Sequence, residues 1–286
     1  MRTFFSLCVI VVCSVAFGAE PYVKKANIPY VPNGGERQQL DIYLPPDYEK
    51  SEKPLPLICF IHGGGWTNGS KDMAVIAANR FVPKGYAVAG ITYRFRPKDP
   101  MPAQVIDCKA AVRWLKAHAK EYNIDADRIG AWGGSAGGHL VAFLGAGGAK
   151  EFDVGENLDQ TSTVQVVIDY FGPADFIGWY KEESAVNQRF NGLFGGTFEE
   201  KKDLIEKMSP ITHVTKTSSP MLIVHAADDN VVPVAQSRKL YEVLQQAGVE
   251  SELIELPTGG HNFAKLSNPE IIEKIVTFFE KHLKQR

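Results

Sequence analysis

The stretch that decides the fold is GAWGGSAGGH, residues 130–139, close to the middle of the chain. An apolar run at 140–144 follows it, so the pattern predicts a short strand at 128–132 that turns sharply into a helix. Residues 133–137 fit G-x-S-x-G, in which a serine stands at the apex of such a turn. Ser135 is therefore the candidate nucleophile of a hydrolase.

The chemistry of such a turn explains the glycine spacing. A serine presented on a tight turn needs neighbours without bulk, because a Cβ beside it would collide with the strand or the helix. A serine at the start of a helix also lies beside backbone N–H groups that can stabilise an oxyanion. Because glycine and serine also cluster in ordinary turns, the hydrolase hypothesis needs a base, an acid and an oxyanion hole elsewhere in the chain.

The bulk composition is that of an ordinary globular protein. The chain has 286 residues, of which 22% are charged and 44% hydrophobic, and its formal net charge is −2. This length suits one large α/β domain or two smaller ones. Since the sequence has no basic patch or charge run, we expect no nucleic-acid partner.

The N-terminus has the pattern of a secretory signal peptide. Arg2 precedes an apolar run at 4–17, and the small residues Gly18 and Ala19 follow. The run is too short for a comfortable membrane span, although an N-terminal anchor or a buried helix is the alternative. We expect a signal peptide at 1–18, cleaved after Gly18 or Ala19, a secreted or periplasmic protein, and no stable membrane insertion afterwards.

The cysteines indicate neither a disulfide framework nor a metal site. Cys8 and Cys13 fall within the signal, whereas Cys59 lies in an apolar strand and Cys108 in a helix. Their spacing matches no metal-binding pattern, so both are expected to be small buried residues. No metal or cofactor is implied, and the oligomeric state stays open.

Apolar runs alternate with amphipathic segments along the remaining chain. This alternation predicts a mostly parallel eight-stranded sheet covered by helices. The segment 172–212, after the sixth strand, reads as irregular and as a small lid-like insertion, so residues 19–286 form one domain. The expected strands are 26–31, 40–44, 57–61, 86–93, 128–132, 164–171, 221–225 and 250–256; the expected helices include 74–81, 103–122, 234–247 and 269–283.

A glycine-rich motif, HGGGW at 62–66, follows the strand at 57–61. Consecutive glycines let the backbone approach a bound carbonyl and direct N–H groups at the developing oxyanion. We expect the N–H groups of Gly64, Gly65 and Ala136 to form the oxyanion hole. Phosphate binding is the alternative for such a loop, but the sequence has neither G-x-x-x-x-G-K-[ST] nor G-x-G-x-x-G.

For several aromatic and histidine side chains, the sequence leaves a functional and a structural role open. His62 is expected to order the loop, and Trp66 either binds substrate or packs in the core. Further aromatic residues could form a substrate wall or belong to the core: Phe171, Phe176, Trp179, Tyr180, Phe190 and Phe194. The remaining histidines His118, His139, His213 and His282 lack a catalytic setting.

Two loops supply a candidate acid and a candidate base. HAADDNVVP at 225–233 follows a strand, and alignment on its final Val-Pro favours Asp229 as the acid, with Asp228 as a turn or capping carboxylate. GGHNF at 259–263 follows the last strand and places His261 between small or polar neighbours. The order Ser135, Asp229, His261 is that of an α/β-hydrolase triad.

The motifs HGGGW, GGSAGGH, HAADDNVVP and GGHNF together resemble those of the α/β-hydrolase superfamily. Within it the chain resembles hormone-sensitive-lipase-like esterases and, more closely, the bifunctional feruloyl and acetylxylan esterase group, over about residues 38–283. The stretch YRFRP at 93–97 departs from the YRLAPE often found in the lipase-like branch, and Ala226 stands where glycine is common. Neither departure touches the three candidate catalytic residues.

The resemblance implies a serine esterase that cleaves short acyl or aromatic esters, including acetyl or feruloyl groups on plant polysaccharides. Ser135 would attack the ester carbonyl while His261, oriented by Asp229, accepts and returns the proton. Two alternatives remain. One is a small amidase or peptidase of the same fold, and the other is a non-catalytic binding protein on a hydrolase scaffold.

Overall fold

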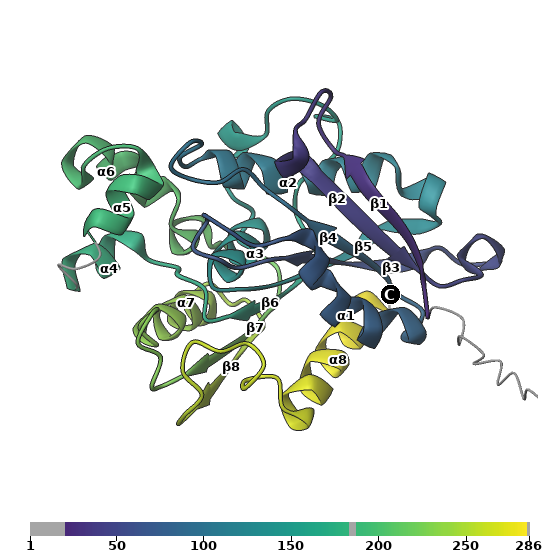
Figure 1. The fold of residues 1–286 in the computed structure, drawn as a ribbon. Helices are drawn as coiled ribbons and strands as arrows, with labels where there is room; N and C mark the ends of the chain where they lie inside the picture. Colours follow the sequence, from purple (N-terminus) through teal and green to yellow (C-terminus); the bar gives the residue numbers. More distant parts are fainter. Residues whose placement is uncertain (1–20, 183–186, 285–286) are drawn as a thin grey trace, which may run out of the picture.

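The computed structural model describes residues 21–182 and 187–284, so the predicted signal peptide at 1–18 lies outside the described residues. An eight-stranded sheet with the order β1-β2-β4-β3-β5-β6-β7-β8 forms the centre of the molecule (Figure 1). The strands are β1 Val23–Pro29, β2 Gln39–Leu44, β3 Leu55–Ile61, β4 Ala87–Ile91, β5 Ile124–Gly134, β6 Val166–Tyr170, β7 Met221–Ala226 and β8 Ser251–Leu256.

The sheet is mostly parallel, as the sequence predicts. β2 runs antiparallel to β1 and β4, whereas β4, β3, β5, β6, β7 and β8 pair in parallel. Every residue of β3 and β4 is buried, which matches the continuous apolar runs expected of strands covered on both faces. The carboxyl ends of β5, β7 and β8 therefore meet at one edge of the sheet, where the three candidate catalytic loops begin.

Helices cover both faces of the sheet (Figure 1). α1 (Val75–Phe81) and α8 (Pro269–Leu283) pack on one face, in a cluster that includes Trp132 of β5. α2 (Ala103–Ala117), α3 (Ala136–Gly145) and α7 (Ala235–Gln246) pack on the other. In the part of the chain that the structure describes, no helix combines the length and apolarity needed to cross a membrane.

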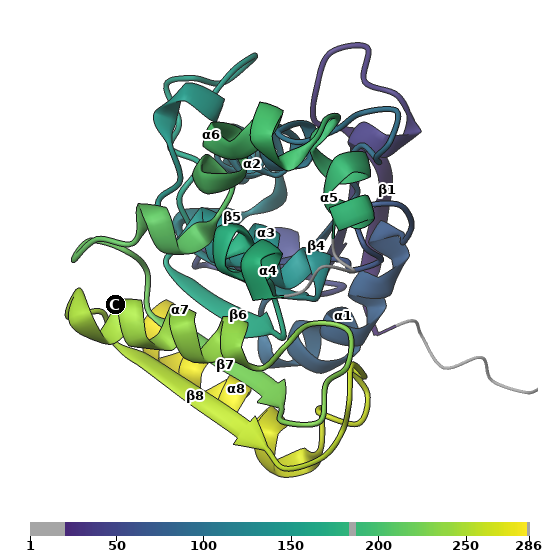
Figure 2. The same cartoon turned by 90° about the vertical axis from the view of Figure 1, so that its left-hand side faces the viewer.

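The segment between β6 and β7 is helical rather than irregular, so this detail of the sequence prediction is wrong. It contains α4 (Phe176–Glu182), α5 (Asn187–Phe194) and α6 (Phe198–Lys207), grouped beside the sheet (Figure 2). α4 and α5 are only 7 and 8 residues long, too short to show a clear helical period in the sequence. Thr197 and Glu200 form a capping box that starts α6.

The helix expected at 103–122 also ends earlier than predicted. α2 stops at Ala117, and a separate 3₁₀ turn at Ala119–Tyr122 leads to Asn123, whose φ of 51° is left-handed. Asn tolerates this conformation better than most residues, which explains why the chain turns there.

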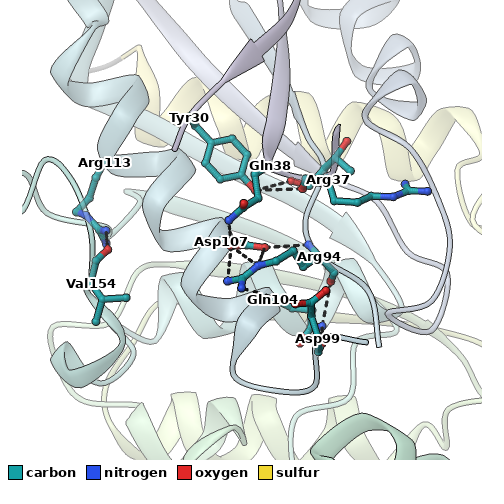
Figure 3. A network of polar contacts seen from close by, with 10 residues as sticks. Tyr30, Arg37, Gln38, Arg94, Asp99, Gln104, Asp107, Arg113 and Val154 are labelled. Carbon is teal, nitrogen blue, oxygen red and sulfur yellow. Dashed lines mark hydrogen bonds and ion pairs between the residues drawn. The ribbon is translucent and has the colours of Figure 1, made fainter. Parts of the chain in front are cut away.

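Three buried cations on α2 hold the segment 148–163 against the helix. Lys109 donates to the carbonyls of Gly148 and Ala149, and Lys116 donates to the carbonyl of Thr163 and the hydroxyl of Thr161. Arg113, labelled in Figure 3 beside Val154, donates to main-chain oxygens of residues 154 and 156 and to Asp153. These charges are satisfied within the fold and have a structural role.

Candidate active site

Ser135 lies at a strained turn between β5 and α3. Its φ and ψ are 58° and −122°, a conformation that non-glycine residues rarely adopt. A Cβ at Gly137 would lie 2.1 Å from the carbonyl oxygen of Ile61, and one at Gly133 would lie 2.5 Å from that of Gly137. The close approach of β3, β5 and α3 therefore requires glycine on both sides of Ser135, as the sequence pattern indicates.

The three candidate catalytic residues lie in one hydrogen-bonded chain. His261 Nε2 lies 2.8 Å from Ser135 Oγ, and His261 Nδ1 lies 2.7 Å from Asp229 Oδ2. Because an ionised carboxylate only accepts hydrogen bonds, Nδ1 carries the proton and Nε2 is left to accept from the serine hydroxyl. The sequence-predicted residues are thus brought together from loops after β5, β7 and β8.

The Asp229 carboxylate is buried and accepts four hydrogen bonds. Oδ1 accepts the N–H groups of Val231 and Val232 at 2.8 and 3.0 Å, and Oδ2 accepts from His261 and from His225 Nε2 at 3.2 Å. Burial acts to raise the pKa of Asp229, but the two imidazoles and the two backbone N–H groups outweigh it and hold the pKa well below its usual range. Asp229 is therefore ionised at neutral pH.

Asp228 stands in the turn after β7, as one of the two sequence alternatives expected, and its carboxylate also binds a second loop. Its Oδ1 accepts the N–H of Gly260 at 2.7 Å, and Gly260 immediately precedes His261. The two adjacent aspartates thus have different hydrogen-bond partners. Asp229 binds the imidazole, and Asp228 binds the main chain that carries it.

The loop at 62–66 faces Ser135, and two of its glycines, Gly64 and Gly65, have left-handed conformations. Gly64 and Gly65 have φ of 110° and 60°, and the carbonyl of Gly64 accepts the N–H groups of Thr67 and Asn68. Within residues 21–182 and 187–284, no protein acceptor takes the N–H groups of Gly64, Gly65 or Ala136. Ala136 is the first residue of α3, as the oxyanion prediction requires.

The segment 92–99 supports this loop by donating hydrogen bonds to its carbonyl groups. The N–H of Arg96 donates to the carbonyl of Trp66 at 2.9 Å, and its Nε donates to that of Gly65 at 3.0 Å. The hydroxyl of Tyr93 donates to the carbonyl of His62 at 2.9 Å, and the two rings stack with centroids 4.4 Å apart. His62 thus orders the loop, as expected.

A buried polar network in turn fixes the segment 92–99 to α2 (Figure 3). The Asp107 carboxylate accepts from the guanidinium and the N–H of Arg94, and also from the Gln38 amide. The Gln104 amide donates to the carbonyls of Arg94 and Asp99. The oxyanion loop is therefore connected through two layers of hydrogen bonds to a long helix of the core.

A cavity of about 470 Å³ opens above Ser135 and His261. Trp66 lines it but is only 8% exposed, and its ring contacts Phe176 edge-on. Trp66 therefore both packs in the core and borders the cavity. Tyr180 and Phe194 do not line the cavity. Its other lining side chains are mostly apolar: Phe60, Met73, Phe171, Pro173, Phe176, Trp179, Phe190, Leu193, Val231, Val232 and Phe263, with Thr67, Asn68 and Arg96 as the polar ones.

The other histidines do not reach Ser135 Oγ in the described part of the chain. Burial lowers the pKa of His62 and of His139 to about 4, so both rings are neutral at pH 7. His139 donates to the carbonyl of Met208 and has a structural role. Over the same described residues, no group of three or more His, Cys, Asp or Glu side chains is placed to hold a metal ion.

Sequence reasoning missed three residues of the site. His225 contacts Asp229, the Phe171 ring lies 4.4 Å from that of His261, and Arg96 supports Gly65. His225 carried a signal, since it opens the HAADDNVVP stretch at the end of an apolar strand. Arg96 lies in a stretch noted only for its departure from a family pattern, and Phe171 only as one of several aromatic residues.

Comparisons with known proteins identify the family of the chain. The BD-FAE family profile matches residues 40–244. The esterase LipQ of Mycobacterium tuberculosis is 31% identical over 83% of this chain and 57% of its own length, so the chain spans less than two thirds of this curated relative. The truncated carbohydrate esterase from gut microbiota is a solved structure with 31% identity and a TM-score of 0.82, over 93% of this chain and 99% of that one.

A second solved structure is the bifunctional GH43-CE protein of Bacteroides eggerthii, with 30% identity and a TM-score of 0.80 over 91% of this chain and 38% of that one. Fold, site and relatives together place the chain in the α/β-hydrolase superfamily. Within that class, the chain belongs to the BD-FAE family.

Proposed function

We propose that this protein is a secreted serine esterase that uses Ser135, His261 and Asp229 to hydrolyse short acyl or aromatic esters. The observation that carries the proposal is the hydrogen-bonded chain from Asp229 through His261 to Ser135, at the floor of an apolar cavity. This arrangement combines a nucleophile, a general base and an orienting carboxylate within direct hydrogen-bond distance.

The proton follows the hydrogen bonds of this chain. His261 Nε2 accepts the proton of Ser135 as Oγ attacks the ester carbonyl, and Asp229 stabilises the imidazolium that forms. The same Nε2 then protonates the leaving alcohol, which yields an acyl-enzyme. In the second half of the reaction His261 takes a proton from water, the hydroxide attacks the acyl carbon, and the acid is released as Ser135 regains its proton.

The N–H groups of Gly64, Gly65 and Ala136 are assigned to the oxyanion. Two of these donors come from the glycine loop and the third from the start of α3, and both segments border the cavity beside Ser135. Losing one such donor costs about 3 kcal/mol of barrier, roughly a hundredfold in rate. The support that Arg96 and Tyr93 give to the loop keeps these donors in place before substrate arrives.

The cavity is large and aromatic enough for more than an acetyl group. Because His261 must protonate the leaving oxygen, the alcohol departs on the histidine side, and the acyl group occupies the opposite side. The rings of Trp66, Phe176 and Phe190 line the same cavity and contact one another in sequence, with centroids 5.9 and 5.6 Å apart. This wall suits an aromatic acyl group such as feruloyl, and a small acyl group such as acetyl also fits.

Plant polysaccharides are the proposed carriers of these esters. The support is the similarity to the truncated carbohydrate esterase from gut microbiota and to the bifunctional GH43-CE protein. Export depends on the N-terminal pattern at 1–18. The intact mass of the exported protein tests this point, since a mature chain that starts at Ala19 or Glu20 is expected and a retained Met1 would contradict it.

The direct test is hydrolysis of p-nitrophenyl esters from acetate to decanoate and of methyl ferulate, with Ser135→Ala as the variant. Loss of the nucleophile should lower kcat on the order of 10⁶-fold. Ser51→Ala removes an exposed serine and serves as the matched control. Equal activity of the wild type and Ser135→Ala would remove Ser135 from the mechanism, and a wild type that cleaves none of these esters would contradict the esterase proposal.

A further inference from the structure

His225 is a buried histidine that the reaction described above does not use. It lies near the end of β7 with a fully buried side chain, and it contacts the same Asp229 oxygen as the catalytic ring. Its Nε2 lies 3.2 Å from Asp229 Oδ2 and 3.0 Å from the carbonyl oxygen of Val232. Its Nδ1 lies 2.7 Å from the hydroxyl of Ser237 on α7.

These partners determine where the proton of His225 lies. A carbonyl oxygen and an ionised carboxylate can only accept hydrogen bonds, so Nε2 must donate to both. In the neutral ring Nδ1 is then an acceptor, and the Ser237 hydroxyl donates to it. This tautomer satisfies both ring nitrogens of a side chain that no water reaches.

We propose that His225 is a positioning residue, which holds the Asp229 carboxylate in the orientation that His261 requires, and that Ser237 fixes the tautomer of His225. The inference rests on the proposed function of Ser135, His261 and Asp229. Oδ2 of Asp229 contacts both imidazoles, and Oδ1 accepts two backbone N–H groups, so these contacts oppose rotation of the carboxylate. Asp229 thus contacts two histidines with different roles: His261 transfers protons, and His225 holds the carboxylate in place.

The second hydrogen bond also shares the negative charge of Oδ2. Without the N–H of His225, more of this charge faces His261 and stabilises its protonated form. The ionisable groups on the surrounding elements are Asp228 beside Asp229, His261 after β8, and Glu255 of β8 in register with His225. Glu255 is paired with Arg238 of α7 at 2.8 Å, so it leaves little net charge near His225.

Three variants test the proposal on the ester that the wild type cleaves best. His225→Phe keeps the ring but loses the donor, and should lower kcat about tenfold or more with little change in KM. It should also move the acid limb of the kcat/KM profile to higher pH, because His225 is one of the contacts that lower the pKa of Asp229 and its loss raises that pKa. His225→Gln places an amide donor near the position of Nε2 and should restore most of kcat, whereas Ser237→Ala should cost only about threefold.

The outcomes separate this proposal from the proposed function. Provided that Ser135→Ala is inactive, two results would overturn the positioning role of His225. One is a His225→Phe variant with the kcat and pH profile of the wild type. The other is a His225→Gln variant whose kcat is as low as that of His225→Phe. Activity in Ser135→Ala would instead overturn the proposed function itself. If His225→Phe does not fold, ¹⁵N NMR of the wild type decides, since the proposal requires the Nε2–H tautomer of His225 and the Nδ1–H tautomer would contradict it.

Discussion

Two buried carboxyl groups at the ends of neighbouring strands behave in opposite ways. Asp169 lies near the end of β6 and Asp229 follows β7, and both side chains are shielded from water. Asp229 accepts four hydrogen bonds and has a pKa well below its usual range. Burial raises the pKa of Asp169 to about 7, because the N–H of Gly172 at 2.9 Å is its one hydrogen-bond donor in the described residues.

The difference shows that burial alone does not decide the charge of a carboxyl group. Removal from water disfavours the ionised form of both carboxyl groups. The hydrogen-bond donors around Asp229 offset this desolvation cost, whereas the single donor to Asp169 does not. A site that needs a permanent negative charge must therefore bring several donors to one residue. The loop after β7 does this by folding back at Val231 and Val232.

The largest expected effect tests the charge of Asp229. Asp229→Asn should reduce kcat about 10⁴-fold, because an amide N–H facing His261 favours the wrong tautomer of the imidazole. The kinetics of ester hydrolysis measure this loss, and Asp159→Asn on the exposed surface is the matched control. A variant that keeps more than a tenth of the activity would show that the charge of Asp229 is dispensable.

A smaller effect is expected on stability at Asp169. Its pKa in the folded protein lies above the value of about 3.9 for an unfolded chain, so the folded state binds an extra proton between these values. The stability that this proton gives is complete below pH 4 and is lost as the pH rises to 7. Between pH 5 and 8, urea unfolding should show the wild type losing about 3 kcal/mol relative to Asp169→Asn. If the free energies of unfolding of the two proteins change equally between pH 5 and 8, Asp169 is already ionised at pH 5.

The smallest effect concerns Asp228, which holds the main chain rather than the ring. Asp228→Ala removes the acceptor for the Gly260 N–H and should lower kcat about fivefold, the equivalent of one exposed hydrogen bond. Asp228→Asn keeps an acceptor oxygen and should recover most of this loss. Equal kcat values for the Ala and Asn variants would indicate that water replaces the carboxylate without moving His261.

The sequence predicted most of the fold because its strongest patterns are local. Uninterrupted apolar runs located β3 and β7, and the boundaries of α8 were given by Pro269 at its start and by its periodic apolar residues. The helices α4 and α5 were missed since neither is long enough for a period to emerge. Their position depends on packing of Phe176 and Phe190 with each other, which no local pattern contains.

The candidate site was predictable only where chemistry needs an unusual residue pattern. Glycines around Ser135 and the chain order of the three loops pointed to the geometry that the structure has. The roles of His225 and Asp228 were not predictable, because each depends on which atom lies opposite in space. Two adjacent aspartates look alike in a sequence, and only the fold directs one to a ring and the other to a backbone N–H.

The buried cations of α2 have a consequence for how this protein can change over evolutionary time. Lys109, Arg113 and Lys116 bind mainly the carbonyl oxygens of segment 148–163, which every amino acid provides. Asp153 and Thr161 are the side chains of the segment that these cations contact, while Val154 and Leu158 are 44% and 59% exposed. The segment therefore keeps its path through its main chain, and its exposed positions such as 154 and 158 are natural places for surface diversification or for an engineered peptide graft.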